Sequence, residues 1–229
     1  MELDPSATIG PQLHAILREK VVRNELPPGA RLSEAEIGRK FGISRQPVRE
    51  AFIKLAEEGL IEIRPQRGTI VRRIDPAMVI DARFVREAVE ADIVRLLAAS
   101  PDPALVTELR HQIETQRRFA HEAPQDFIRA DEHFHRTLAR GAGKEGAWEI
   151  MQGPKSQMDR VRFLSFGLNA TGKLIDQHIA IVDRIEQADV AGADRATRTH
   201  LRAVLEDLPE LMRANPDAFT GTPETLPET

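Results

Sequence analysis

Residues 33–59 contain two short amphipathic segments joined by a tight turn, and this arrangement leaves few folds open to the N-terminal part of the chain. Ser33 precedes the first segment as an N-cap, and Glu36 three residues later completes a capping box. The turn consists of residues 41–44, and its glycine supplies a positive φ. The second segment ends at Gly59. The sequence therefore predicts a helix-turn-helix.

Flanking elements complete a small domain. Residues 9–25 carry apolar side chains at helical spacing, and a proline-glycine stretch ends them. Residues 60–63 and 69–71 are typical of two short strands, with residues 64–68 as their turn. Three helices and a two-stranded wing predict a winged helix-turn-helix domain over residues 1–74.

The chain changes character after Asp75-Pro76, a pair typical of a helix start. From residue 77 to 214 the pattern is helical throughout, and Gly and Pro residues divide it into six helices. We predict these helices at 76–99, 103–121, 124–141, 155–169, 171–190 and 193–213. The fold is therefore expected to be mainly α, with an antiparallel six-helix bundle over residues 75–214. Residues 215–229 hold three prolines and few apolar residues, which predicts a disordered tail.

Charge and composition restrict the partners. Residues 1–74 carry 13 Lys and Arg against 10 Asp and Glu, whereas the rest carries 19 against 26. A basic head on an acidic body suggests that only the head meets phosphate. The chain has no cysteine, so any metal must be held by His, Asp or Glu. With no signal sequence and no membrane-length apolar run, we expect a cytoplasmic protein without a membrane partner.

Polar residues at the start of the second helix are candidates for reading DNA. Arg45 and Arg49 lie four apart and could each contact guanine or a phosphate. Gln46 could read a base edge, while the hydroxyl of Ser44, which caps this helix, suits a phosphate. Arg67-Gly68 at the wing tip would reach the minor groove. The alternative is that the two arginines only decorate a solvated surface, but the ordered series of cap, turn, basic helix and wing favours DNA.

This N-terminal region resembles the GntR family of bacterial regulators. The residues that carry the resemblance are Pro28–Leu32, Ser33-Glu34, Phe41–Ala51, Glu58–Leu60 and Arg67-Gly68. The resemblance implies a homodimer on double-stranded DNA with an inverted-repeat operator, and it puts Arg45, Arg49 and Gly68 at positions that usually touch DNA. Some members have an arginine at the position of Ala35, where it contacts phosphate. Arg31 is the candidate to replace it here.

Four residues of the helical region form a candidate metal site. Asp131 and His135 share one helix face, and His178 and His200 lie on the two last helices. Oxygen and imidazole donors suit zinc, nickel, manganese, iron or copper. The alternative from spacing alone is that His178 and His200 are hydrogen-bonded core residues.

The helical region resembles the FCD type of GntR regulator. The matching residues are Arg86–Glu90, Leu96–Ala98, Asp131 to His135, His178 and His200. This resemblance implies a divalent metal on the aspartate and the three histidines, with zinc favoured over nickel, manganese or iron. It also implies that the metal helps to bind a small carboxylate effector. Members that respond to fatty acyl groups tend to lack these histidines.

Three arginines are candidates to bind the effector. Arg86 offers a guanidinium fork that matches a carboxylate, although an ion pair with Glu90 is an equal alternative. Arg160 and Arg162 precede His178 and are further candidates. Sugar acids, hydroxy acids, dicarboxylates and amino acids all fit this description.

These features predict a ligand-responsive, DNA-binding transcriptional regulator, with repression the commoner outcome in related proteins. One rival is a metal-dependent enzyme with a DNA-binding head. We expect no enzyme, because the chain has no catalytic motif and Glu132 points about 100° away from Asp131 around its helix. The other rival is a dimeric DNA binder without an effector, which would show no ligand-induced thermal shift.

Overall fold

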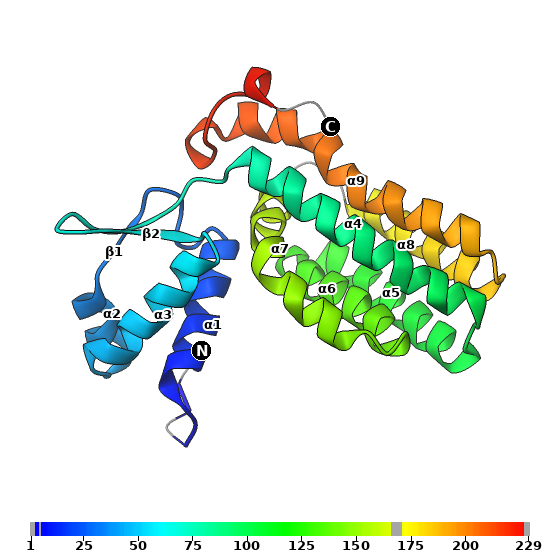
Figure 1. Cartoon of the computed structure of the whole chain (residues 1–229), viewed down its shortest axis with the longest axis horizontal. Helices are drawn as coiled ribbons and strands as arrows, with labels where there is room; N and C mark the ends of the chain where they lie inside the picture. The colour runs from blue at the N-terminus through cyan, green and yellow to red at the C-terminus, as the bar shows by residue number, and fades with distance from the viewer. Residues whose placement is uncertain (1–2, 5, 166–170, 227–229) are drawn as a thin grey trace. The chain divides into compact units, whose positions relative to one another are not determined.

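The computed structural model describes residues 3–4, 6–165 and 171–226 (Figure 1). The described residues form two compact units. One unit comprises the residues up to Met78 together with those from Met212 onward, and the other comprises Val79–Leu211. The fold is mainly helical, as predicted.

The N-terminal unit is a winged helix-turn-helix. Its elements in chain order are α1 (Ile9–Val22), β1 (Arg31–Leu32), α2 (Glu34–Phe41), α3 (Arg45–Glu57), β2 (Ile61–Arg64) and β3 (Gly68–Val71). Antiparallel pairing gives the strand order β1-β3-β2, so the sheet has three strands rather than the two predicted. The two-residue β1 is too short to show an alternating pattern, and its pairing with β3 alone defines it.

Apolar faces of α1 and α3 form the core of this unit. Leu13 and Leu17 on α1 pack in one cluster with Val48, Phe52 and Leu55 on α3. All five side chains are buried, at the spacing that the sequence indicates. This packing leaves the opposite face of α3, with its polar residues, in solvent.

The turn between α2 and α3 has the expected geometry. Gly42 has φ 66°, a left-handed conformation that costs a residue with a Cβ more than glycine. Ser33 Oγ accepts a 3.3 Å hydrogen bond from the backbone N–H of Glu36, which is the predicted cap of α2. Ser44 occupies the N-cap position of α3, but its side chain makes no capping hydrogen bond, contrary to the prediction.

Six helices make up the second unit: α4 (Pro76–Ala99), α5 (Pro103–Glu122), α6 (Pro124–Gly141), α7 (Glu145–Ser165), α8 (Thr171–Glu186) and α9 (Val190–Ala214). Only the first residues of α4 and the last of α9 belong to the other unit. Helix α5 packs against α6 and α8, and α6 packs against α7. The core contains Leu109, Phe134, Trp148, Ile181 and Val182, all buried.

Helix α7 differs from its prediction. It begins at Glu145 and continues through residues 153–154, where the sequence suggested a helix start at 155. Trp148 and Met151 are buried in the bundle core. Their burial stabilises the helical turn before the proline. This stabilisation is larger than the cost of the one backbone hydrogen bond that the proline cannot donate. The predicted end at 169 lies outside the described residues.

Residues 215–226 form a defined path in the structure, where composition predicts a disordered tail. They contain two short 3₁₀ helices, η2 (Pro216–Ala218) and η3 (Pro223–Thr225). Phe219 is 1% exposed and pairs with Ile74 in a parallel bridge. The N–H of Ile74 donates to Ala218 at 2.8 Å, and its carbonyl accepts from Thr220 at 2.9 Å. The burial of one phenylalanine in a polar stretch explains why composition alone predicts disorder here.

Candidate functional site

The predicted DNA-binding residues lie on exposed parts of the N-terminal unit. Four of them, Ser44, Arg45, Gln46 and Arg49, lie at the start of α3, and all are exposed. Arg67 and Gly68 are exposed at the junction of β2 and β3, and Arg31 is exposed on β1.

The two arginines of α3 differ in their partners. Arg49 donates from Nε and Nη2 to Glu34, each at 3.2 Å. Its side chain remains 60% exposed, so water can replace this partner readily. Arg45 has no ion pair with any described residue. Gln46 donates to Glu50 at 3.1 Å.

The four predicted metal ligands come together inside the helical unit. Asp131 and His135 lie on α6, His178 on α8 and His200 on α9, and each is at most 4% exposed. One ligand atom from each lies within 4.8 Å of the other three. The Nε2 atom of His200 is 3.1 Å from that of His135 and 3.3 Å from that of His178. Asp131 Oδ1 is 3.5 Å from Nε2 of His178.

Outer partners assign the proton on two of these imidazoles to Nδ1. The amide N–H of Gln116 donates to the carbonyl of Ala130, which turns its Oε1 toward His178. Nδ1 of His178, 2.7 Å from that oxygen, must therefore donate. Nδ1 of His200 likewise lies 3.1 Å from Oε1 of Gln177.

The third histidine has a charged partner. Nδ1 of His135 lies 2.7 Å from Oε2 of Glu90, in a contact that is close but not aligned as a hydrogen bond. With the proton on Nδ1 of each ring, three Nε2 lone pairs converge beside a carboxylate. Such lone pairs repel one another at about 3 Å unless a cation lies between them.

Electrostatics keep the cluster in its ligating form. Burial lowers the pKa of His178 to about 3 and lowers that of His200 well below its usual value, so both rings are neutral. Burial alone would raise the pKa of Asp131, but the adjacent guanidinium of Arg162 holds it well below its ordinary value. Asp131 Oδ2 is buried without a hydrogen-bond partner. Neutral imidazoles, an ionised carboxylate and an orphaned oxygen fit a divalent cation.

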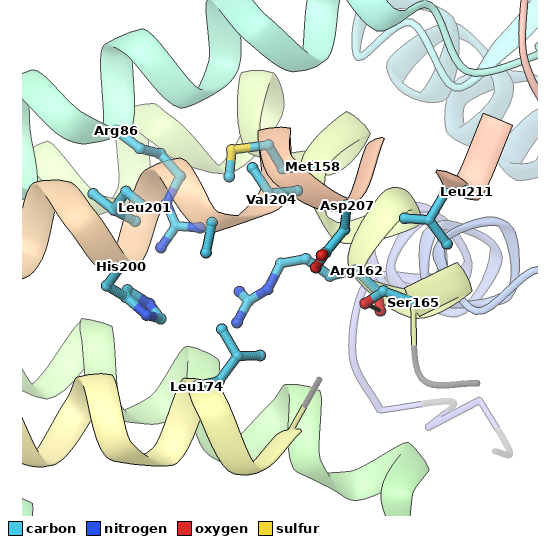
Figure 2. A pocket seen from close by; sticks show the side chains of 11 residues that line it. Arg86, Met158, Arg162, Ser165, Leu174, His200, Leu201, Val204, Asp207 and Leu211 are labelled. Atoms are coloured by element: carbon cyan, nitrogen blue, oxygen red, sulfur yellow. Dashed lines mark hydrogen bonds between the residues drawn. The ribbon is translucent and has the colours of Figure 1, made fainter. Parts of the chain in front are cut away.

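A pocket adjoins the cluster on one side (Figure 2). Its empty space totals about 440 Å³, including the part open to solvent. The guanidinium groups of Arg86 and Arg162 and the imidazole of His200 point into the same space, with Leu174 and Met158 among the apolar lining. Arg162 donates from Nη2 to Asp131 Oδ1. Two cations and a candidate metal ligand at one small pocket suit a small anion.

Arg86 makes the ion pair that the sequence offered as an alternative, and it also lines the pocket. Its Nε donates to Glu90 Oε1 at 2.5 Å, which is the alternative ion pair. Its Nη2 is buried without a hydrogen-bond partner among the described residues. Arg160 does not line the pocket; its Nη1 donates to Gln157 at 3.4 Å, and burial lowers its pKa to about 10.

The outer partners of the histidines were not identified from the sequence. Gln116 follows the buried positions Leu109 and Ile113 on α5, so a polar residue in an apolar stripe was an available signal. Glu90 appeared only as the ion-pair partner of Arg86. Gln177 had no signal beyond its place beside a candidate ligand.

Among the described residues, no helix is long and apolar enough to span a bilayer.

Relatives extend over nearly the whole chain. An uncharacterized HTH-type transcriptional regulator in an unstable DNA locus of Streptomyces ambofaciens is 41% identical over 92% of this chain and 89% of its own. The HTH-type transcriptional repressor RspR of Escherichia coli (strain K12) is 37% identical over 96% of this chain and 97% of its own.

A solved structure supports the fold. The structure of E. coli McbR/YncC matches with a TM-score of 0.75 at 16% identity, covering 91% of this chain and 99% of that one. The family of bacterial regulatory proteins, gntR family, matches residues 11–71, and the FCD domain matches residues 81–203. The chain therefore belongs to the GntR family of bacterial transcriptional regulators and carries an FCD domain.

Proposed function

We propose that this regulator is a repressor that binds a small carboxylate at a metal site in its helical unit and changes its hold on DNA in response. The convergence of three bare Nε2 atoms on an ionised aspartate is the observation that carries the metal assignment. Repression is favoured because relatives such as RspR are repressors.

Asp131, His135, His178 and His200 would hold the ion, and zinc is the best candidate for this donor set. When bound, the ion would supply a positive charge and an open coordination position for an anion. Arg86 lines the same pocket and has a donor at Nη2 without a partner among the described residues, and Leu174 is part of the apolar lining. Arg86 and Arg162 at the pocket favour an organic acid, whose carboxylate a guanidinium can bind.

DNA binding is assigned to the exposed residues of α3, the wing and β1. Arg45, Gln46 and Arg49 would enter a major groove, and Ser44 is available to a phosphate because its hydroxyl does not cap α3. Arg67 and Gly68 would lie at the minor groove, and Arg31 at the backbone. The operator would be an inverted repeat read by a homodimer in the cytoplasm.

Glu132 favours a regulator over the rival hydrolase. A hydrolase would need a general base beside the metal-bound water. Glu132 adjoins Asp131 in sequence, but its carboxylate faces Lys155, with Oε1 3.5 Å from Nζ. Glu132 is thus engaged outside the cluster.

Metal content and ligand response test the proposal. Native protein should contain close to one equivalent of zinc or another divalent metal by mass spectrometry, and His178→Ala should lose most of it. His133→Ala is the matched control, because His133 is exposed on the same helix as two ligands. A panel of small carboxylates should contain at least one that raises the unfolding temperature of native protein. Equal metal in native protein and H178A would refute the metal site, and no thermal shift across the panel would refute the sensor.

A further inference from the structure

One carboxylate lies between the candidate metal site and the candidate anion site. Glu90 is on α4, one turn after Arg86, and is 4% exposed. Its Oε1 accepts from Nε of Arg86 at 2.5 Å, and its Oε2 lies 2.7 Å from Nδ1 of His135. The two oxygens therefore face two different functional groups.

Glu90 differs in charge from the other outer partners. Gln116 and Gln177, which face His178 and His200, are neutral amides. Glu90 is a carboxylate in a buried ion pair, because Nε of Arg86 donates to its Oε1 at 2.5 Å. An anionic acceptor at Nδ1 increases the electron density on the opposite nitrogen of the ring and makes it a stronger ligand.

Arg86 reaches both Glu90 and the pocket. Its Nε contacts Glu90, whereas its buried Nη2 has no hydrogen-bond partner among the described residues. The guanidinium points into the space that His200 and Arg162 also face (Figure 2). The positive charge of Arg86 now neutralises the carboxylate of Glu90 alone. An anion bound at Nη2 would interact with the same positive charge.

We propose that Glu90 is a positioning residue that couples metal binding to anion binding through the chain of contacts Arg86, Glu90 and His135. An anion bound to Arg86 neutralises part of the guanidinium charge, so the Glu90 carboxylate interacts more strongly with His135. This stronger interaction makes the imidazole of His135 a better metal ligand. By thermodynamic linkage, bound metal then raises the affinity for the anion by the same factor. This inference rests on the proposed function.

The competing explanation is a local ion pair that only stabilises α4, since Arg86 and Glu90 are spaced i,i+4. A purely structural pair would change the unfolding free energy of metal-free protein without changing metal affinity. Zinc affinity therefore separates the two explanations.

The first measurement is zinc affinity by competition with a chromophoric chelator, starting from metal-free protein. Glu90→Gln keeps the shape of the side chain and should lower zinc affinity about 10- to 100-fold. Glu132→Gln is the matched control, because Glu132 faces Lys155, and it should leave zinc affinity unchanged. Unchanged zinc affinity in E90Q would overturn the proposal.

The second measurement tests the coupling. Removing the arginine charge in Arg86→Gln should raise zinc affinity, and the rise should be at least threefold larger in the native background than in the E90Q background. Equal changes in both backgrounds would overturn the coupling. If R86Q does not fold, Arg86→Met serves the same cycle, because it also removes the charge and keeps an unbranched side chain.

The two hypotheses fail separately. If H178A retains its zinc, the metal site itself is wrong. If H178A loses zinc while E90Q keeps native affinity, only the coupling through Glu90 is wrong.

Discussion

The two arginines at the start of α3 have the same spacing that the sequence shows, but they do not have the same freedom. Arg49 is engaged by both oxygens of Glu34 on the preceding helix, whereas Arg45 has no ion pair with a described residue. A DNA contact by Arg49 must therefore exchange one anionic partner for another. Arg45 has no anionic partner to give up, so it is the better candidate to contact a DNA base.

Arg45→Ala should weaken binding to a genomic fragment that native protein selects. A bidentate arginine contact to guanine is worth about 1–3 kcal/mol, so we expect roughly a 10- to 100-fold loss in a gel-shift titration. Arg49→Ala should cost less and should reduce the salt dependence of binding, as expected for a phosphate contact.

Arg117→Ala provides the comparison for these variants, since Arg117 is an exposed arginine of the helical unit with an ion pair to Glu114. If R45A binds as tightly as R117A, α3 does not read DNA through Arg45.

Sequence reasoning predicted the ligands of the candidate metal site, but it did not predict the residues that surround them. Asp131 and His135 were found because helical periodicity places i and i+4 on one face. Gln116 comes from α5 and Glu90 from α4, and no local pattern indicates which polar residue of a distant helix will meet a given imidazole. The sequence offered both a carboxylate ligand and an ion pair with Glu90 for Arg86. Only the structure shows that its Nε makes the ion pair while its Nη2 has no described hydrogen-bond partner.

At the scale of elements, an ion-pair cluster joins α4 to α9. Glu87 is 3% exposed and accepts hydrogen bonds from Arg83 on its own helix and from Arg198 and Arg202 on α9. The two α9 arginines flank His200, and Glu87 lies between Arg86 and Glu90 in sequence. The cluster therefore fixes the register of the two helices that carry these groups.

Glu87→Gln should destabilise the helical unit by about 1–3 kcal/mol at pH 7, because three guanidinium groups lose their shared anion. The arginines, Arg202 foremost, lower the pKa of Glu87 to about 2. A lowered carboxyl pKa adds stability above the unfolded value near 4.5, and this stability is lost as the pH falls toward 2. The difference between native protein and E87Q in urea unfolding should thus be constant from pH 8 to 5 and shrink below pH 4.5.

Glu108→Gln is the control for that experiment. Glu108 pairs with Arg140 at 2.8 Å, but both side chains are about half exposed, and exposed pairs contribute little. A pH-independent difference between native protein and E87Q would contradict the role given to Glu87.

Gly42→Ala should destabilise the N-terminal unit by about 1 kcal/mol in thermal or urea unfolding. An added Cβ would meet nothing within 4 Å, so the cost comes from the left-handed backbone alone. Gly146→Ala on α7 also has open space and has an ordinary helical φ. It should stabilise by up to about 0.5 kcal/mol. Effects of the same sign in both variants would rule out the backbone explanation.

At the scale of the whole molecule, the proposed homodimer needs an apolar face. The outward side of α4 exposes Phe84 at 67%, Val85 at 40% and Leu96 at 50%. Val85 and Leu96, eleven residues apart, lie on one side of the helix, and Phe84 lies about 100° away from Val85 around it. A second copy of the chain is the partner that the proposed inverted-repeat operator would require.

Phe84→Glu should shift the protein from dimer to monomer in light scattering, raising the dissociation constant at least tenfold by placing a charge in an apolar contact. Ile150→Glu is the matched control, since Ile150 on α7 is 81% exposed and lies outside α4. A monomer produced by I150E but not by F84E would place the dimer face elsewhere.

The pairing of Phe219 with Ile74 has a consequence for protein synthesis. The N-terminal unit contains residues from both ends of the chain, so a ribosome that has made only the first third has not yet produced all of it. Ile74 has its backbone partners only after residues 218–220 have been made. A nascent chain that stops before Phe219 would therefore lack the bridge that joins the two segments of this unit.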